Sequence, residues 1–351
     1  MSLYYHVVLL GEQVGDIFYI FRFYYGMFFL FFGFYAFLLW FDPGTKRALT
    51  WARSLASTVL IISFLLAVFE VAGLFLGVVH PSQLTWAHDR SIASITDGSF
   101  SLIRANSIAA NPSVLGGFSL FLVLYLYGTS EHPTRFREAF VLVLGLATVL
   151  LSQSGTGLLL LAITFFVFCL RLSTFRKTET NALLLTVLVV MALGIIYSQF
   201  NEDGRLSPES REFYPFLLQL IADFVKDSSS PGYLSPFFGL INIRQFNKLD
   251  AEDLLWGNPT LQYYLRFYDF AYVAFLIELG IVGLASYLFS LRSLVNRAFP
   301  REDFAVRWGF GVLLLATLHY PVSFWVCSQV MVAVILATGI YVRETSSQDK
   351  R

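Results

Sequence analysis

The chain has 351 residues, of which 56% are hydrophobic and only 14% are charged. This composition is too apolar for an ordinary soluble domain, so we predict a membrane protein with several crossings. The formal net charge is zero, which gives no basic field for nucleic acid, and we expect no nucleic-acid partner.

Apolar runs predict the membrane-crossing helices. A hydrocarbon core of about 30 Å takes about 20 apolar residues to cross. The long runs are 17–40, 54–79, 181–198, 269–291 and 323–342. The shorter runs, which cross only with tilt or with support from neighbouring helices, are 113–128, 139–151, 156–172 and 307–320. Because unpaired backbone polar groups are costly in lipid, we predict an all-α, polytopic integral membrane protein with about nine transmembrane helices, forming a single membrane domain over residues 1–351.

The distribution of lysine and arginine predicts the orientation. Most of the 24 basic residues fall in five segments on one side of the predicted helices. These segments are 46–53, 135–137, 171–177, 292–307 and 343–351. The positive-inside rule places them in the cytoplasm, with the C-terminus. No lysine or arginine precedes Arg22, so we expect the N-terminus on the outer side, without the positive start of a signal peptide.

With this orientation, residues 199–268 form one large extracytoplasmic loop between transmembrane helices. The loop carries four arginines, which are candidate substrate-binding residues: Arg205, Arg211, Arg244 and Arg266. Several fixed cations on one outer surface would neutralise a diphosphate leaving group without a metal. For any single arginine, a salt bridge to the many acids of the loop is the alternative.

A second candidate segment is RANSIAANPSVLGGF, just before the run 113–128. The Arg104 guanidinium, with Asn106 beside it, can hold a phosphate or a carboxylate with two hydrogen bonds. Binding of lipid headgroups, or capping of a helix end, is the alternative. Within the same segment, Asn111 and Pro112 predict the start of a helix.

Other polar features inside the apolar part of the chain are few. SQSGTG, from Ser152 to Gly157, predicts a turn between two short helices. Glu70 and Glu278 fall inside predicted helices, where ionisable groups are candidates for function, although hydrogen bonds between packed helices explain them equally well. The aromatic run FRFYYGMFFLFFGFYAF near the start is expected to face lipid. The sequence has no GxxxxGK[ST], HExxH or CxxC motif, and we expect neither a metal nor a cofactor.

The order of these features resembles the O-antigen polymerase and O-antigen ligase superfamily of bacterial surface-polysaccharide enzymes. Three segments carry the resemblance. They are RANSIAANPSVLGGF, then LLSQSGTGLLLLAI, and then the large loop followed by YDFAYVAFLIELGIVGLASYL, which has a polar residue, an aromatic run and E-x-G-x-x-G. Together they span roughly residues 100–290.

The resemblance implies a metal-independent, inverting glycosyltransferase of the C-type fold in the bacterial inner membrane. It would polymerise undecaprenyl-diphosphate-linked repeat units into O-antigen or a related surface polysaccharide, a part of lipopolysaccharide biosynthesis. Arg104 and the loop arginines would bind the diphosphate, and Asp269 or Glu278 would deprotonate the acceptor hydroxyl. The implied partners are lipid-linked glycans, membrane lipids, a chain-length regulator and a flippase.

Three alternatives stay open. The ligase branch usually has a histidine near the end of the large loop, whereas this chain has Tyr268 and Asp269 there and no histidine between His132 and His319. A lipid-linked oligosaccharide flippase or other transporter would usually show inverted repeats, and we find none. A purely structural membrane protein is the third alternative.

Overall fold

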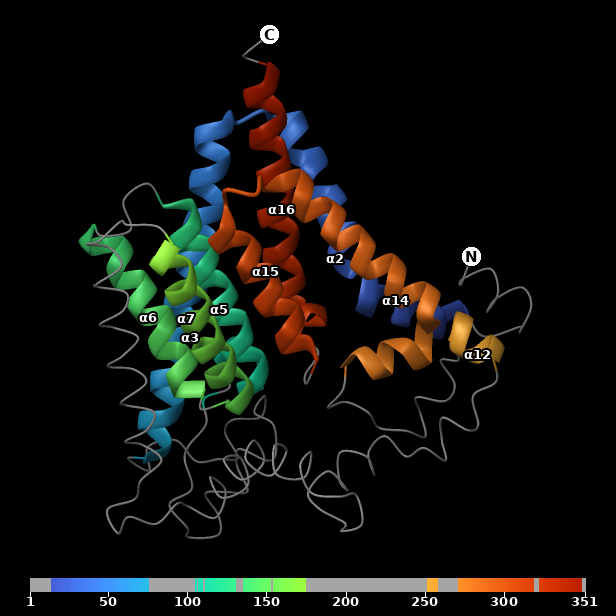
Figure 1. Cartoon of the computed structure of the whole chain (residues 1–351), viewed down its shortest axis with the longest axis horizontal. Coiled ribbons are helices and arrows are strands. Elements are labelled where there is room, and N and C mark those ends of the chain that lie inside the picture. The colour runs from blue at the N-terminus through green and yellow to red at the C-terminus, as the bar shows by residue number, and fades with distance from the viewer. Residues whose placement is uncertain are drawn as a thin grey trace. The chain divides into compact units, whose positions relative to one another are not determined.

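We describe the structure from a computed structural model of the chain. It describes residues 14–75, 105, 107–109, 111–130, 135–152, 154–174, 251–257, 271–318 and 322–348. Within these ranges every regular element is a helix, which confirms the all-α prediction (Figure 1). The elements are α2 (Val14–Phe41), α3 (Thr45–Phe75), η3 (Ser107–Ala109), α5 (Pro112–Thr129), α6 (Phe136–Ser152), α7 (Gly155–Thr174), α12 (Ala251–Trp256), α14 (Ala271–Ala298), α15 (Phe304–Thr317), η4 (Val322–Phe324) and α16 (Val326–Gln348).

Among the described residues, five helices are long and apolar enough to cross a membrane. Their apolar parts are Phe23–Phe41, Thr45–Gly73, Pro112–Thr129, Phe275–Ala298 and Val326–Ser347. Two shorter apolar helices are Thr156–Phe168 and Phe304–Thr317. The chain is therefore a membrane-embedded protein by length and composition of its helices. The predicted run 181–198 lies outside the described residues, and the count of about nine crossings stays a prediction.

The contacts divide the chain into two compact units. Unit 1 comprises Met1–Ala93, Ile103–Leu161 and Asp253–Arg351, and unit 2 comprises Ser94–Leu102 and Ala162–Glu252. Almost all of the described residues belong to unit 1, so the arguments below concern that unit alone.

Helix α5 lies at the centre of unit 1. It packs against α15 and α6, while α16 packs against α2 and α3. Every residue of α5 from Val114 to Leu126 is buried. Small residues let the neighbouring backbones approach closely, as at Gly117, where an added Cβ would lie 2.6 Å from the Cβ of Ala316. Such contacts are typical of helix packing in membranes, where no water drives the helices together.

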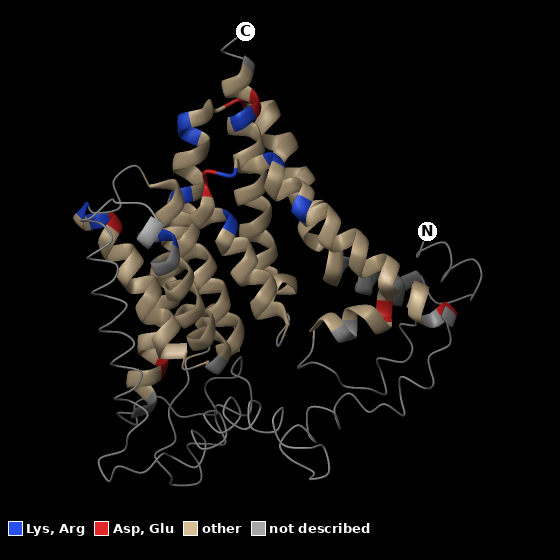
Figure 2. Cartoon of the chain, in the orientation of Figure 1, with Lys and Arg blue, Asp and Glu red and all other residues tan. Residues whose placement is uncertain are grey.

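Basic residues gather at one end of the helices of unit 1, the end where α2 joins α3 (Figure 2). Arg53 of α3 forms an ion pair with Glu138 of α6, with 3.0 Å between Nη2 and Oε1. Arg297 of α14 pairs with Glu344 of α16 at 2.6 Å, and the Tyr35 hydroxyl of α2 donates to the same carboxylate. Four of the five predicted cytoplasmic segments therefore lie at one end, and the side of the membrane that this end faces stays a prediction.

Candidate functional site

The segment before α5 enters the helix through a capped start, as the sequence predicted. Pro112 is the first helical residue, and the side-chain oxygen of Asn111 accepts hydrogen bonds from the backbone N–H groups of Ser113 at 2.8 Å and Val114 at 3.3 Å. A cap of this kind stabilises a helix by about 1 kcal/mol. The cap therefore fixes the start of α5.

Glu70 of α3 anchors the same segment from the side. Its side chain is only 1% exposed, and both carboxyl oxygens lie 3.0 Å from the backbone nitrogen of Ser107, which donates to them. The Ser107 hydroxyl donates to the Ser63 carbonyl at 2.8 Å. Ser107 has a φ of 49°, which costs a non-glycine residue about 1–2 kcal/mol. These hydrogen bonds hold it there, so Glu70 joins α3 to the start of α5.

The serine-rich turn between α6 and α7 packs against the start of α5. The Ser154 hydroxyl lies 3.1 Å from the Ser113 hydroxyl and donates to it. The backbone N–H of Ala105 donates to the Leu151 carbonyl at 3.1 Å. Residues that the sequence separates by about 40 positions are thus hydrogen-bonded at one place. Two of the three segments that carry the family resemblance lie side by side.

Two glycines make this contact possible. A Cβ added to Gly116 would lie 3.0 Å from the Ser152 hydroxyl oxygen and 3.1 Å from the Cα of Gly157. A Cβ added to Gly157 would in turn lie 3.1 Å from the Cα of Gly116. The backbones of α5 and α7 therefore touch directly, which only small residues allow.

The third segment contains a break in helix α14. Gly280 has φ 68° and ψ −178°, which interrupts the helical backbone two residues after Glu278. The Glu278 side chain is 2% exposed. The Tyr24 side chain of α2 hydrogen-bonds to this carboxyl, while Oε1 has no partner among the described residues. An unpartnered buried oxygen costs about 1–3 kcal/mol, and groups left this way in a native protein call for a functional explanation.

A buried aromatic cluster surrounds this part of α14. Its members are Tyr24 of α2, Phe275 and Tyr287 of α14, and Phe324 of η4. The ring centroids lie 4.3 Å apart for Tyr24 and Phe275, and 5.2 Å apart for Tyr287 and Phe324. Packed rings of this kind contribute about 0.5–1.5 kcal/mol a pair beyond their buried area. The aromatic run near the start of the chain is thus only partly lipid-facing, because Tyr24 belongs to the core.

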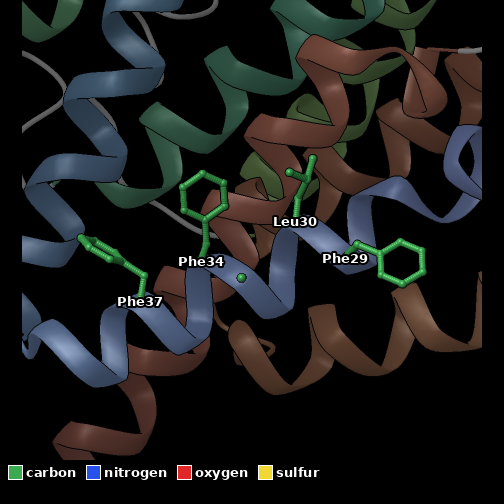
Figure 3. Close-up of a pocket in the computed structure, with 5 residues that line it drawn as sticks. Phe29, Leu30, Phe34 and Phe37 are labelled. Atoms are coloured by element: carbon green, nitrogen blue, oxygen red, sulfur yellow. The ribbon is translucent and has the colours of Figure 1, made fainter.

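An open hollow of about 420 Å³ lies along α2 (Figure 3). It is lined by Phe29, Leu30, Gly33, Phe34 and Phe37. These side chains carry no group that could hold a phosphate or a hydroxyl. The hollow is typical of a lipid-facing helix surface, as predicted for this run, and we do not assign the candidate site to it.

Among the predicted site residues, only Glu278 lies within the described part of the chain. The others lie outside the described ranges: Arg104, Asn106, Arg205, Arg211, Arg244, Arg266 and Asp269. The neighbours of Arg104 and Asn106 are fixed by Glu70 and by the serine-rich turn. Whether the loop arginines meet Glu278 stays a prediction. No pattern in the sequence predicts Tyr24 as a neighbour of Glu278.

Comparisons with protein-family models, with curated proteins and with solved structures found no match to this chain.

Proposed function

We propose that this chain is a bacterial glycosyltransferase that joins undecaprenyl-diphosphate-linked repeat units into O-antigen or a related surface polysaccharide. The contact between the start of α5 and the serine-rich turn is the observation that carries the proposal. These two segments resemble one enzyme superfamily, and they pack together through Ser113, Ser154, Gly116 and Gly157. Segments that share one contact are expected to serve one site.

The position of this contact along the helices supports a site at the membrane surface. Lys46, in the first turn of α3, belongs to the basic end, and Glu70 follows 24 residues later. At a rise of 1.5 Å per residue, the two lie about 36 Å apart along α3, which is close to the full thickness of the hydrocarbon core. The Glu70 contact is therefore at the opposite surface, which we propose is the outer one.

In the proposed reaction, the acceptor hydroxyl of one lipid-linked glycan attacks the anomeric carbon of another. The bond from that carbon to the diphosphate oxygen breaks with inversion, and undecaprenyl diphosphate leaves. Arg104 and the loop arginines neutralise the charge that develops on the diphosphate, so no metal is needed. Asp269 or Glu278 accepts the proton of the acceptor hydroxyl. The buried Oε1 of Glu278, which has no partner among the described residues, has the accepting capacity that this role requires.

Arginine variants in the native host test the proposal. Arg104→Ala, Arg205→Ala, Arg211→Ala and Arg244→Ala are each expected to shorten or abolish the ladder of surface glycan on a gel. Lysine at the same positions should restore it poorly, because it offers no planar pair of donors. Arg292→Ala is the matched control, since Arg292 is exposed on α14 toward the basic end. Normal chain lengths in all four alanine variants would refute diphosphate binding by these residues.

A further inference from the structure

Helix α12 ends against the break in α14, and the contact is made by one glycine from each segment. Gly257, directly after α12, has a φ of 86°, and Gly280 in α14 has a φ of 68°. A Cβ on Gly257 would lie 2.4 Å from the carbonyl carbon and oxygen of Glu278. A Cβ on Gly280 would lie 2.3 Å from the Leu255 carbonyl oxygen and 2.6 Å from the Gly257 nitrogen. We refer to this pair as the glycine contact.

The glycine contact admits no other residue without movement. All of the nearest atoms belong to the backbone, which cannot turn aside as the end of a flexible side chain can. Both glycines also have a left-handed φ, which costs any other residue about 1–2 kcal/mol. A single methyl group at either position therefore forces the two segments apart.

The contact falls at the place where α14 needs external support. Gly280 interrupts the helical backbone, so the regular hydrogen-bond ladder does not fix Glu278 relative to the second half of the helix. The backbone of Glu278 lies directly against Gly257, while its side chain meets Tyr24 of α2. The carboxyl is thus located by two separate elements.

We propose that Gly257 and Gly280 are positioning residues, whose contact holds the Glu278 carboxyl in place for proton transfer from the acceptor hydroxyl. This inference rests on the proposed function, in which an acid at α14 takes that proton. Because α12 belongs to the predicted loop 199–268, the placement of the loop end on α14 sets the position of the acid.

The contact itself is tested by cross-linking in the full chain. Leu255 and Ile281 flank the glycine contact and are 43% and 48% exposed, so cysteines there are accessible. After Cys169 and Cys327 are replaced by serine, Leu255→Cys with Ile281→Cys should cross-link with a short bifunctional maleimide. Trypsin cleaves at Arg266 between them, so mass spectrometry detects the linked peptides. We expect Gly280→Ala to lower the cross-linked fraction at least tenfold.

The role in catalysis is tested in proteoliposomes. The substrate is the undecaprenyl-diphosphate-linked repeat unit extracted from the deletion strain of the native host. Gly280→Ala is expected to lower kcat on the order of 10²-fold, with KM within about twofold, because a shift of about 1 Å in a reacting group has this effect. Gly311→Ala is the control, since a Cβ there would meet only Trp308 at 3.7 Å. Gly257→Ala is the second test variant, to be used if Gly280→Ala does not reach the membrane.

The outcomes separate this inference from the proposed function. Loss of the cross-link together with a fall in kcat supports it. A wild-type cross-link in Gly280→Ala, or a lost cross-link with unchanged kcat, overturns it. If Glu278→Gln keeps the wild-type kcat, Glu278 is not the acid and the inference fails, while polymerisation itself stands. If the wild-type protein does not extend the extracted substrate, the proposed function fails, and the cross-link still decides the glycine contact.

Discussion

Removal of the Glu70 carboxylate is expected to destabilise the protein in a graded way. In Glu70→Ala, the buried N–H of Ser107 loses the two oxygens that it now reaches at 3.0 Å. A buried donor left without its acceptor costs about 1–3 kcal/mol. We therefore expect a decrease of about 2 kcal/mol for alanine. Glu70→Gln keeps one of the two acceptor oxygens and should lose about 1 kcal/mol.

Thermal unfolding of the protein in detergent measures these changes. An unfolding entropy of about 2.1 cal/mol/K per residue gives about 0.7 kcal/mol/K for 351 residues, so Glu70→Ala should lower Tm by about 3 °C and Glu70→Gln by about half of that. Glu302→Ala is the control, because Glu302 is exposed and its replacement should change stability by less than about 0.5 kcal/mol. If Glu70→Ala has the same Tm as Glu302→Ala, Glu70 does not anchor the segment before α5.

Two further predictions concern packing and charge. Gly116→Val should destabilise the protein by about 1–3 kcal/mol because it overpacks the contact between α5 and α7. Gly33→Val is the control and should not destabilise it, because nothing lies within 4 Å of a Cβ there. Equal Tm values for the two variants would contradict this packing. Burial opposes ionisation of Glu138, but the hydrogen bond from Ser130 and the charge of Arg53 outweigh it and lower its pKa. The contribution of Glu138 to the stability of the folded protein is therefore complete above its ordinary pKa of 4.5. This contribution is lost as the pH falls through the lower pKa of the folded state. Tm measured against pH should show this loss, and the dependence of Tm on pH should be weaker in Arg53→Gln. The same dependence in Arg53→Gln and in the wild type would refute the pairing of Arg53 with Glu138.

The helices were largely predictable because their apolar runs are long. The runs 17–40 and 113–128 fall within α2 and α5, and the run 323–342 begins in η4 and covers most of α16, since hydropathy reports directly on what lipid tolerates. The start of α3 was misplaced, at 54 instead of Thr45. Its first turns carry charged residues of the basic end, which a search for apolar residues excludes although they are helical.

The break in α14 was not predicted. The run 269–291 looks continuous in hydropathy, which does not register a left-handed φ at Gly280. The glycine of E-x-G-x-x-G was the available signal, because a glycine inside a helix often marks a special backbone conformation.

The partners of the buried acids also could not be predicted from the sequence. Glu70 and Glu278 are both ionisable groups inside predicted helices, and nothing in the sequence separates their roles. The partner of Glu70 is a backbone N–H 37 residues away, and every non-proline residue carries such a group. The contact of Glu278 with Tyr24 joins residues that lie 254 positions apart in the chain. Only the packing of the helices distinguishes Glu70, whose two oxygens accept from Ser107, from Glu278, whose Oε1 has no partner among the described residues.

The most direct test of the proposed function is a gel of the surface glycan from the native host with this gene deleted, beside the complemented strain. The proposed polymerase predicts lipid A core that carries one repeat unit and no ladder, because ligation and transport across the membrane still work. Bare core would contradict it: full-length glycan left on the lipid carrier would identify a ligase, and repeat units trapped on the cytoplasmic face would identify a flippase. An unchanged ladder would contradict a role in this polysaccharide altogether.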